Sequence, residues 1–216
     1  MPENMNKKLI VLSADGVLLD NKMSSFKEIL MILGKGSEAE EIDKEYQQRK
    51  QGSPWGLEQL AQLYQGLSED KLKETAMKYC QENLAEGAKE CVNELKEKGY
   101  IVGALSSNPQ FILDSLAQNL SLDFAEGTEL EFKEGIATGK IQKRVDRYIK
   151  AEILQNKREH YGLETEDVIV VGDSITDIPM AELAGIFIGF SPKDGIVKEK
   201  ATKVVENFPQ LRKELL

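Results

Sequence analysis

The sequence has few of the residues that mark secreted, membrane-spanning or redox-active proteins. It contains two cysteines, Cys80 and Cys91, which form no C-x-x-C pair. Two isolated thiols support neither a disulfide framework nor a cysteine-based metal site, and free thiols are typical of a reducing compartment. No apolar run approaches the ~20 residues that cross a bilayer, and the first ten residues include no signal-peptide hydrophobic segment. We therefore expect a cytoplasmic protein with no membrane partner.

Positive charge is also scarce. The chain has 28 Lys and Arg against 37 Asp and Glu, a net charge of −9, and no basic stripe. A surface of this kind repels nucleic acid, so we expect no nucleic-acid partner. The net negative charge does not exclude a small anionic substrate, because positive side chains in a binding pocket can outweigh the repulsion from more distant negative charges. With 216 residues and 41% hydrophobic residues, the chain can form one globular core, or a core with a smaller insert.

Two patterns divide the chain. Residues 24–86 are predicted to be almost entirely helical, interrupted by glycines. From residue 87 on, apolar runs such as "YIVGAL" and "DVIVVGD" alternate with helical segments, and "ELEFKEGIATGKI" predicts a hairpin that turns near Glu134 and Gly135. Fully apolar strands separated by helices indicate an α/β fold, with a parallel sheet covered on both faces.

Polar residues gather after three of the predicted strands. They are Ser13 and Asp15 after the first strand, Ser106, Ser107 and Asn108 after the second, and Asp173 and Asp177 after the third. Ligands of open parallel sheets bind beyond the carboxyl ends of the strands, so these side chains are expected to converge. Lys150, at the start of a predicted helix, is the best candidate for a cation among them. Carboxylates, hydroxyls and one lysine suit a divalent cation and a phosphate group.

Each of these residues also has an ordinary structural interpretation. An aspartate after a strand, such as Asp173, is often a helix cap, and Ser106 alone would be a turn residue. Asn108 followed by Pro109 is typical of a helix start. Lys150 by itself would be a solvated lysine. The functional interpretation therefore depends on the order and spacing of the whole set.

Four segments match a known order of motifs. "SADGVL" is similar to a first motif D-x-D-G-[TV]-L, with Ser13 in place of the first aspartate. "YIVGALSS" resembles a second motif, a strand that ends in Ser or Thr, with Ser106 as the best match and Ser107 as the alternative. "YIKAEIL" resembles a third motif through Lys150, which precedes Asp173 by 23 residues. "VIVVGDSITDIPM" is similar to a fourth motif, hhhhGDxxxD, and is the most specific of the four.

On these motifs the chain resembles the haloacid dehalogenase superfamily of phosphohydrolases, in particular its phosphoserine phosphatase-like branch. The resemblance covers nearly all of residues 8–206, although the helical segment matches in position and type more than in sequence. It implies a Rossmann-like three-layer core formed by residues 1–20 and 87–216, and an inserted helical cap domain at residues 21–86.

The resemblance also implies an activity, which is Mg²⁺-dependent hydrolysis of a small phosphorylated metabolite through an aspartyl-phosphate. The implied roles at the matching positions are Ser13 for attack on phosphorus, Asp15 as general acid/base and as carbonyl ligand of Mg²⁺, Ser106, Ser107 and Lys150 for phosphate binding, and Asp173 and Asp177 for the metal.

Ser13 changes the expected chemistry. A serine hydroxyl is not an ionised nucleophile at neutral pH, and it gives a metal site one negative ligand fewer. The one histidine, His160, lies in the charged stretch "NKREHYG" and is expected at the surface, so it offers no general base. We therefore expect weak or absent hydrolysis. The alternatives are a non-catalytic member that binds a phosphorylated ligand or a partner protein, and a deliberately substituted chain whose natural residue is aspartate.

The early helical segment argues against phosphoserine itself as the substrate. The resemblance leads us to expect an acidic residue shortly after the first motif and an arginine in the cap. Lys22 stands where the acid is expected, and "SPWGLEQLAQL" contains no arginine. Trp55 in that stretch could form a wall of the substrate pocket or pack inside the cap. The sequence leaves the oligomeric state open.

Overall fold

A sheet built around the first strand organises the protein. The computed structural model describes residues 8–21 and 23–216, and within them the strands form a seven-stranded sheet in the order β4-β3-β2-β1-β5-β6-β7. The strands are β1 (Leu9–Leu12), β2 (Ile101–Pro109), β3 (Phe124–Lys133), β4 (Ile136–Lys143), β5 (Val168–Gly172), β6 (Ile186–Phe190) and β7 (Lys203–Val205). All neighbouring strands are parallel except β3 and β4. The prediction of a parallel α/β sheet is confirmed.

The position of β1 explains why its sequence is apolar at every residue. It pairs with β2 and β5, with Leu9 opposite Ile101 on one side and opposite Val168 on the other. Ile10 and Leu12 belong to one hydrophobic cluster, and Leu9 and Val11 to a second cluster on the other face. Successive side chains of a strand point to opposite faces, so a strand with helices on both faces is apolar throughout.

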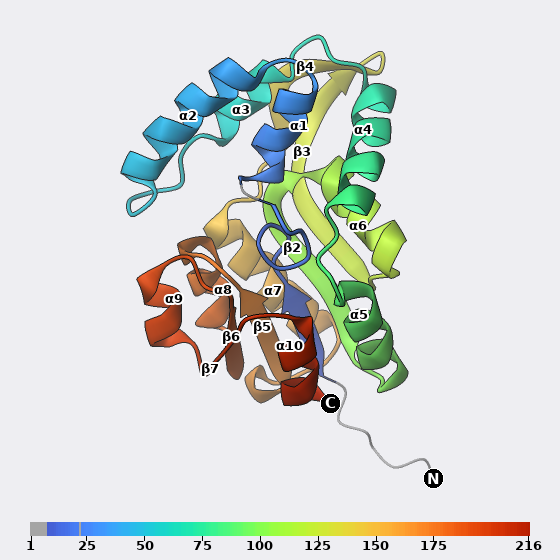
Figure 1. The fold of residues 1–216 in the computed structure, drawn as a ribbon, viewed down its shortest axis with the longest axis vertical. Helices are drawn as coiled ribbons and strands as arrows, with labels where there is room; N and C mark the ends of the chain where they lie inside the picture. Colours follow the sequence, from blue (N-terminus) through green and yellow to red (C-terminus); the bar gives the residue numbers. More distant parts are fainter. Residues whose placement is uncertain (1–7, 22) are drawn as a thin grey trace.

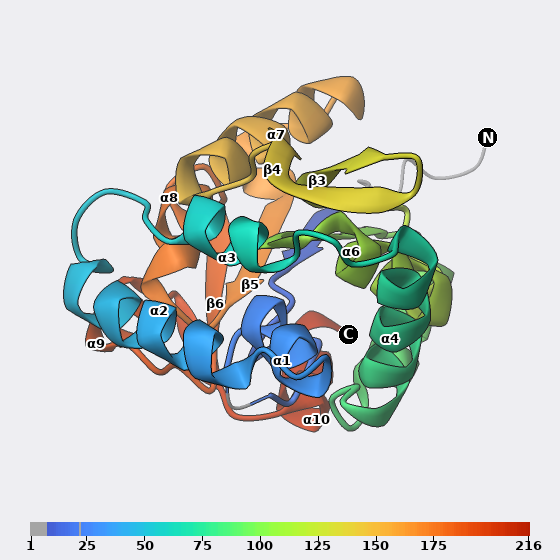
Figure 2. The ribbon, with the colours of Figure 1, turned by 90° about the horizontal axis from the view of Figure 1, so that it is seen from above.

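The helices form two groups (Figures 1 and 2). The helices before residue 87 are α1 (Ser25–Ile32), α2 (Gly36–Arg49), α3 (Leu57–Leu63) and α4 (Glu69–Glu82); those after it are α5 (Ala88–Glu97), α6 (Gln110–Leu120), α7 (Arg147–His160), α8 (Ile178–Ala181), α9 (Gly195–Lys200), α10 (Phe208–Leu215) and the short 3₁₀ helices η1 (Thr165–Asp167) and η2 (Ile175–Asp177). Helices α1 to α3 lie beyond the carboxyl ends of β1 and β2, whereas α4 runs beside α6 (Figure 1). None of the helices in the described part of the chain is long and apolar enough to cross a membrane.

The predicted hairpin is present and connects the sheet to the early helices. Lys133 of β3 pairs with Ile136 of β4, which leaves Glu134 and Gly135 as a two-residue turn. Both turn residues have positive φ, as a type I′ turn requires. The tip is anchored, because the backbone carbonyl of Gly135 accepts a hydrogen bond of 2.8 Å from the N–H of Glu69, the first residue of α4.

Candidate functional site

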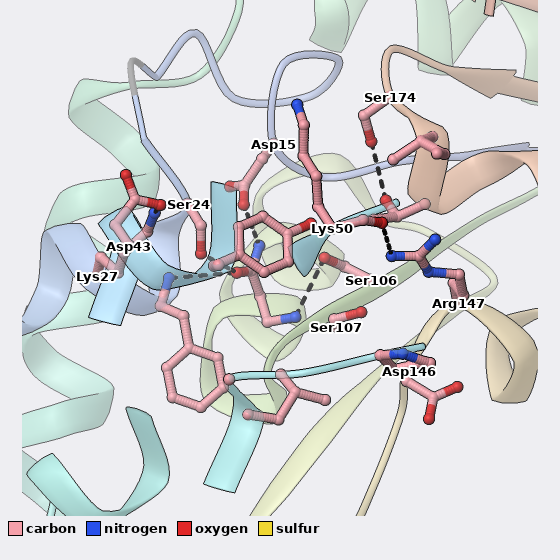
Figure 3. A pocket seen from close by; sticks show the side chains of 18 of the residues that line it. Asp15, Ser24, Lys27, Asp43, Lys50, Ser106, Ser107, Asp146, Arg147 and Ser174 are labelled. Carbon is pink, nitrogen blue, oxygen red and sulfur yellow. Dashed lines mark hydrogen bonds and ion pairs between the residues drawn. The ribbon is translucent and has the colours of Figure 1, made fainter. Parts of the chain in front are cut away.

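A cavity of about 280 Å³ lies at the carboxyl ends of β1, β2 and β5, under helices α1 to α3 (Figure 3). The predicted site residues that line it are Ser13, Asp15, Ser106, Ser107, Lys150 and Asp173. They come from segments up to 160 positions apart, and the parallel sheet brings them together because its strands end at the same edge. Asp177 is the exception: its side chain is fully buried behind the cavity wall.

Asp177 fixes the orientation of Lys150 and of the loop after β5. One of its carboxylate oxygens accepts a hydrogen bond from Lys150 Nζ at 2.7 Å, and the other accepts from the backbone N–H of Asp173 at 3.1 Å. Lys150 is 1% exposed, so this ion pair is desolvated. Gly172 permits the arrangement, because a Cβ there would lie 2.5 Å from the side chain of Asp177.

Asp15 is held by a polar network that sequence reasoning missed. Its carboxylate accepts hydrogen bonds from Asn21 Nδ2 at 2.6 Å, from Asn108 Nδ2 at 2.8 Å, and from the N–H and hydroxyl of Ser25. The expectation that Asn108 caps a helix is wrong, because β2 extends through Pro109 and α6 starts at Gln110. The amide of Asn108 instead links the end of β2 to Asp15 and to α1. Its position among polar residues at a strand end was the available signal.

Ser13 lies at the floor of the cavity without a partner that could activate it. Ser13 is 6% exposed. Its backbone N–H donates a hydrogen bond of 2.9 Å to the carbonyl of Val171, which continues the pairing of β1 with β5. Among the described residues its hydroxyl group makes no hydrogen bond to a carboxylate or an imidazole. His160 lies at the end of α7 with its ring edge-on to Tyr161, and the structure places it at the surface, as the sequence predicted.

Asp173 pairs with a lysine that the sequence did not single out. Lys193 Nζ lies 3.1 Å from Asp173 Oδ2, and burial, with a further contribution from the charge of Asp177, raises the pKa of Asp173 to about 7. Gly16 makes room for the pair, because a Cβ there would lie 2.2 Å from Asp173 Oδ2 and 2.8 Å from Lys193 Nζ. Lys193 follows β6, and no motif in the sequence marks it.

The raised pKa of Asp173 predicts a pH dependence of stability. The folded chain binds this proton more tightly than the unfolded chain, whose carboxyl has an ordinary pKa near 3.8. The free energy of unfolding is therefore expected to fall as the pH rises from about 4 to about 7. In the Asp173→Asn variant this carboxyl is absent, so its unfolding free energy should decrease less between about pH 5 and about pH 8 than that of the unsubstituted chain. Urea unfolding of both proteins at the two pH values measures the difference. An equal fall in both proteins would contradict the prediction.

The donor set does not fit a resident Mg²⁺ centre as it stands. Asp173 and Asp177 each have a lysine ammonium group as partner, and the carboxylate of Asp15 is turned toward its amide and hydroxyl donors. Ser13 supplies a neutral hydroxyl where the resemblance expects a carboxylate. Within residues 8–21 and 23–216, no three His, Cys, Asp or Glu side chains lie close enough together to hold a metal ion. Hard divalent cations prefer several anionic oxygen ligands, so the site lacks one negative ligand.

Comparison with known proteins agrees with the fold and the motif order. The profile of the family "haloacid dehalogenase-like hydrolase" matches residues 7–185. The chain belongs to this family. It is 34% identical over 199 residues to phosphoserine phosphatase of Archaeoglobus fulgidus, covering 92% of the chain but only 56% of that relative, so the chain spans little more than half its length. It is 32% identical to phosphoserine phosphatase of Methanocaldococcus jannaschii, covering 93% of the chain and 92% of the relative.

A solved structure supports the same assignment. The chain superposes on a phospho-aspartyl intermediate analogue of phosphoserine phosphatase with a TM-score of 0.83 and 29% identity, covering 98% of this chain and all of the other. The predicted membership of the haloacid dehalogenase superfamily is thus confirmed, and the chain is phosphoserine phosphatase-like. Lys22, on which part of the substrate argument depended, lies outside the described residues.

Proposed function

We propose that this haloacid dehalogenase-like protein binds a small phosphate monoester in the cavity, and that it hydrolyses the ester slowly or not at all. The observation that carries the proposal is Ser13, a buried neutral hydroxyl at the position where the family motif has the attacking aspartate. Within the part of the chain that the structure describes, this hydroxyl has no base as a hydrogen-bond partner. In the proposed site Ser106, Ser107 and Lys150 bind the phosphoryl group, and Asp15 is the residual acid/base group.

Anion binding does not depend on the missing nucleophile. Lys150 and Ser106 line the cavity from α7 and from the end of β2, and both are held by hydrogen bonds, from Lys150 to Asp177 and from the N–H of Asn108 to Ser106 Oγ. Side chains held in this way lose little conformational entropy when a phosphate binds. In this proposal residues 21–86 form a cap domain over the core of residues 1–20 and 87–216, with the cavity between them.

Mg²⁺-dependent hydrolysis is the second candidate function, although the donor set as it stands lacks one negative ligand. It is favoured by the similarity to phosphoserine phosphatases and by the presence of Asp15, Asp173 and Asp177 at the motif positions. Haloacid dehalogenase-type phosphatases of this branch typically use Mg²⁺. In the native chain the missing carboxylate at position 13 is expected to weaken metal binding.

Binding can be tested without turnover. Millimolar inorganic phosphate, p-nitrophenyl phosphate and phosphoserine should each be added to the purified chain, with the melting temperature as the readout. A ligand that binds the folded state raises the melting temperature, and its free-energy effect grows by about 1.4 kcal/mol for each tenfold excess over Kd. We expect a rise with at least one phosphate compound, and a smaller rise for Ser106→Ala.

The control for this experiment is Ser37→Ala, which removes an exposed hydroxyl from α2 outside the cavity. It should show the same ligand-dependent rise as the native chain. If Ser107→Ala reduces the ligand-dependent rise in melting temperature and Ser106→Ala does not, the phosphate contact is assigned to Ser107. If no phosphate compound raises the melting temperature of the native chain, the proposed binding function is wrong.

A further inference from the structure

We propose that the ammonium group of Lys193 takes the place of a divalent cation in the cavity, so that this chain binds a phosphoryl group without a metal ion. The inference rests on the proposed function, since it assumes that the cavity binds a phosphate monoester. Lys193 lies in the loop after β6 and lines the cavity.

The fold brings Lys193 to the place where a cation is expected. Strands β1 and β5 are paired neighbours, with Leu12 opposite Val171. Ser13 and Asp173 therefore follow adjacent strands at the same edge of the sheet. The motif resemblance implies a divalent cation held by carboxylates at these two positions, and here only one of the two is a carboxylate. Lys193 Nζ lies 3.1 Å from its Oδ2 atom.

The backbone holds Lys193 at this place. Its N–H donates a hydrogen bond of 3.0 Å to the carbonyl of Asp173, and the carboxylate of Asp194 accepts a hydrogen bond of 2.9 Å from the N–H of Ile175. Two consecutive residues are thus bonded to the loop after β5. Gly16 leaves space for the ammonium group, because a Cβ there would lie 2.8 Å from Nζ. A lysine on an unanchored loop would lose more conformational entropy on reaching the same point.

The charges at this edge suit one ammonium group better than a divalent cation. Asp177 is paired with Lys150 and Ser13 is neutral, so Asp173 is the metal-motif carboxylate that is left to balance a cation. One carboxylate balances the single charge of an ammonium group. Hard divalent cations prefer several anionic oxygen ligands. The loss of the carboxylate at position 13 and the presence of Lys193 on Asp173 are therefore consistent with each other.

Lys193 also keeps donors for a ligand. Its side chain is 54% exposed, whereas the side chain of Lys150 is 1% exposed. An ion pair with this exposure holds its partners weakly, so the ammonium group can shift toward an incoming phosphate at little cost. The group has three N–H donors, and the contact with Asp173 occupies one of them. The other two can donate charge-assisted hydrogen bonds to phosphoryl oxygens, so that Lys193 bridges the carboxylate and the phosphate.

Calorimetric titration with inorganic phosphate, once in EDTA and once in millimolar Mg²⁺, tests the inference. We expect the native chain to bind phosphate with the same affinity in both buffers. Lys193→Met should weaken binding in EDTA about tenfold, the effect of one charge-assisted hydrogen bond, and Lys193→Arg should keep most of the native affinity. In Ser13→Asp, which adds the second carboxylate, Mg²⁺ should instead strengthen phosphate binding.

The matched control is Lys198→Met, which removes an exposed lysine of α9 outside the cavity and should bind phosphate as the native chain does. A much lower native affinity in EDTA than in Mg²⁺ would assign the charge to a metal ion and overturn the inference, with the proposed function intact. Equal affinities of Lys193→Met and the native chain in EDTA would leave Lys193 a structural partner of Asp173 and would also overturn it. A Ser13→Asp variant that ignores Mg²⁺ would show that no cation is replaced, with the same consequence. If the native chain binds no phosphate in either buffer, the proposed function itself is wrong.

Discussion

The Ser13→Asp variant is expected to hydrolyse p-nitrophenyl phosphate in the presence of Mg²⁺ on the order of 1,000-fold faster than the native chain, or more. The substitution provides an ionised nucleophile at the end of β1, where the cavity floor now has a neutral hydroxyl. It also supplies the negative ligand that the donor set lacks. Turnover rates of both proteins, with Mg²⁺ and with EDTA, give the measurement.

The control for this experiment is Ser13→Asn, which has nearly the shape of aspartate without its charge. It should remain as inactive as the native chain. If the native chain already turns over at a rate comparable to Ser13→Asp, another residue attacks phosphorus and the account of Ser13 is wrong. If Ser13→Asp shows no activity while phosphate still binds, the family resemblance extends to the fold and the ligand but not to the reaction.

The second large effect is expected at the buried ion pair of Lys150 and Asp177. Lys150→Met leaves the carboxylate of Asp177 buried without its cation, which costs about 3–5 kcal/mol of unfolding free energy. The double variant Lys150→Met with Asp177→Leu should be more stable than Lys150→Met alone, because both charges are then absent. Urea unfolding of the native chain and the two variants gives the free energies.

An exposed ion pair provides the comparison. Lys71 and Glu74 lie 2.9 Å apart on α4 with most of their side chains in solvent, and Lys71→Met should cost no more than about 1 kcal/mol. An effect of Lys150→Met as small as that of Lys71→Met would contradict the assignment of Lys150 and Asp177 as a desolvated pair.

The sequence predicted the parts of the site that depend on local pattern. Apolar strands followed by polar residues indicated both the sheet and the edge where ligands bind, and the structure lines the cavity with Ser13, Asp15 and Ser106 as expected. The hairpin turn at Glu134 and Gly135 was predictable for the same reason, because its signal lies within neighbouring residues.

The residues that sequence reasoning missed act through distant partners. The bond between Asn108 and Asp15 joins residues 93 positions apart, and the Lys50–Asp194 pair joins residues 144 apart. Neither spacing has a sequence signature, because the separation depends on the lengths of the helices between them. In the sequence nothing distinguishes Lys193 and Arg147 from the other basic residues, of which the chain has 28 in all. Only the fold shows that Lys193 forms an ion pair with Asp173.

The sequence by itself determined the family of this protein, the order of its strands along the chain, and the replacement of a motif aspartate by Ser13. These depend on residue identity and on short-range periodicity. Only the tertiary structure decided the charge balance of the cavity. Within residues 8–21 and 23–216, Lys27, Lys50, Lys150 and Lys193 each pair with a carboxylate, whereas Arg147 does not. Electrostatic interaction depends on distance and burial, and these become defined only when the sheet and the helices around the cavity are packed.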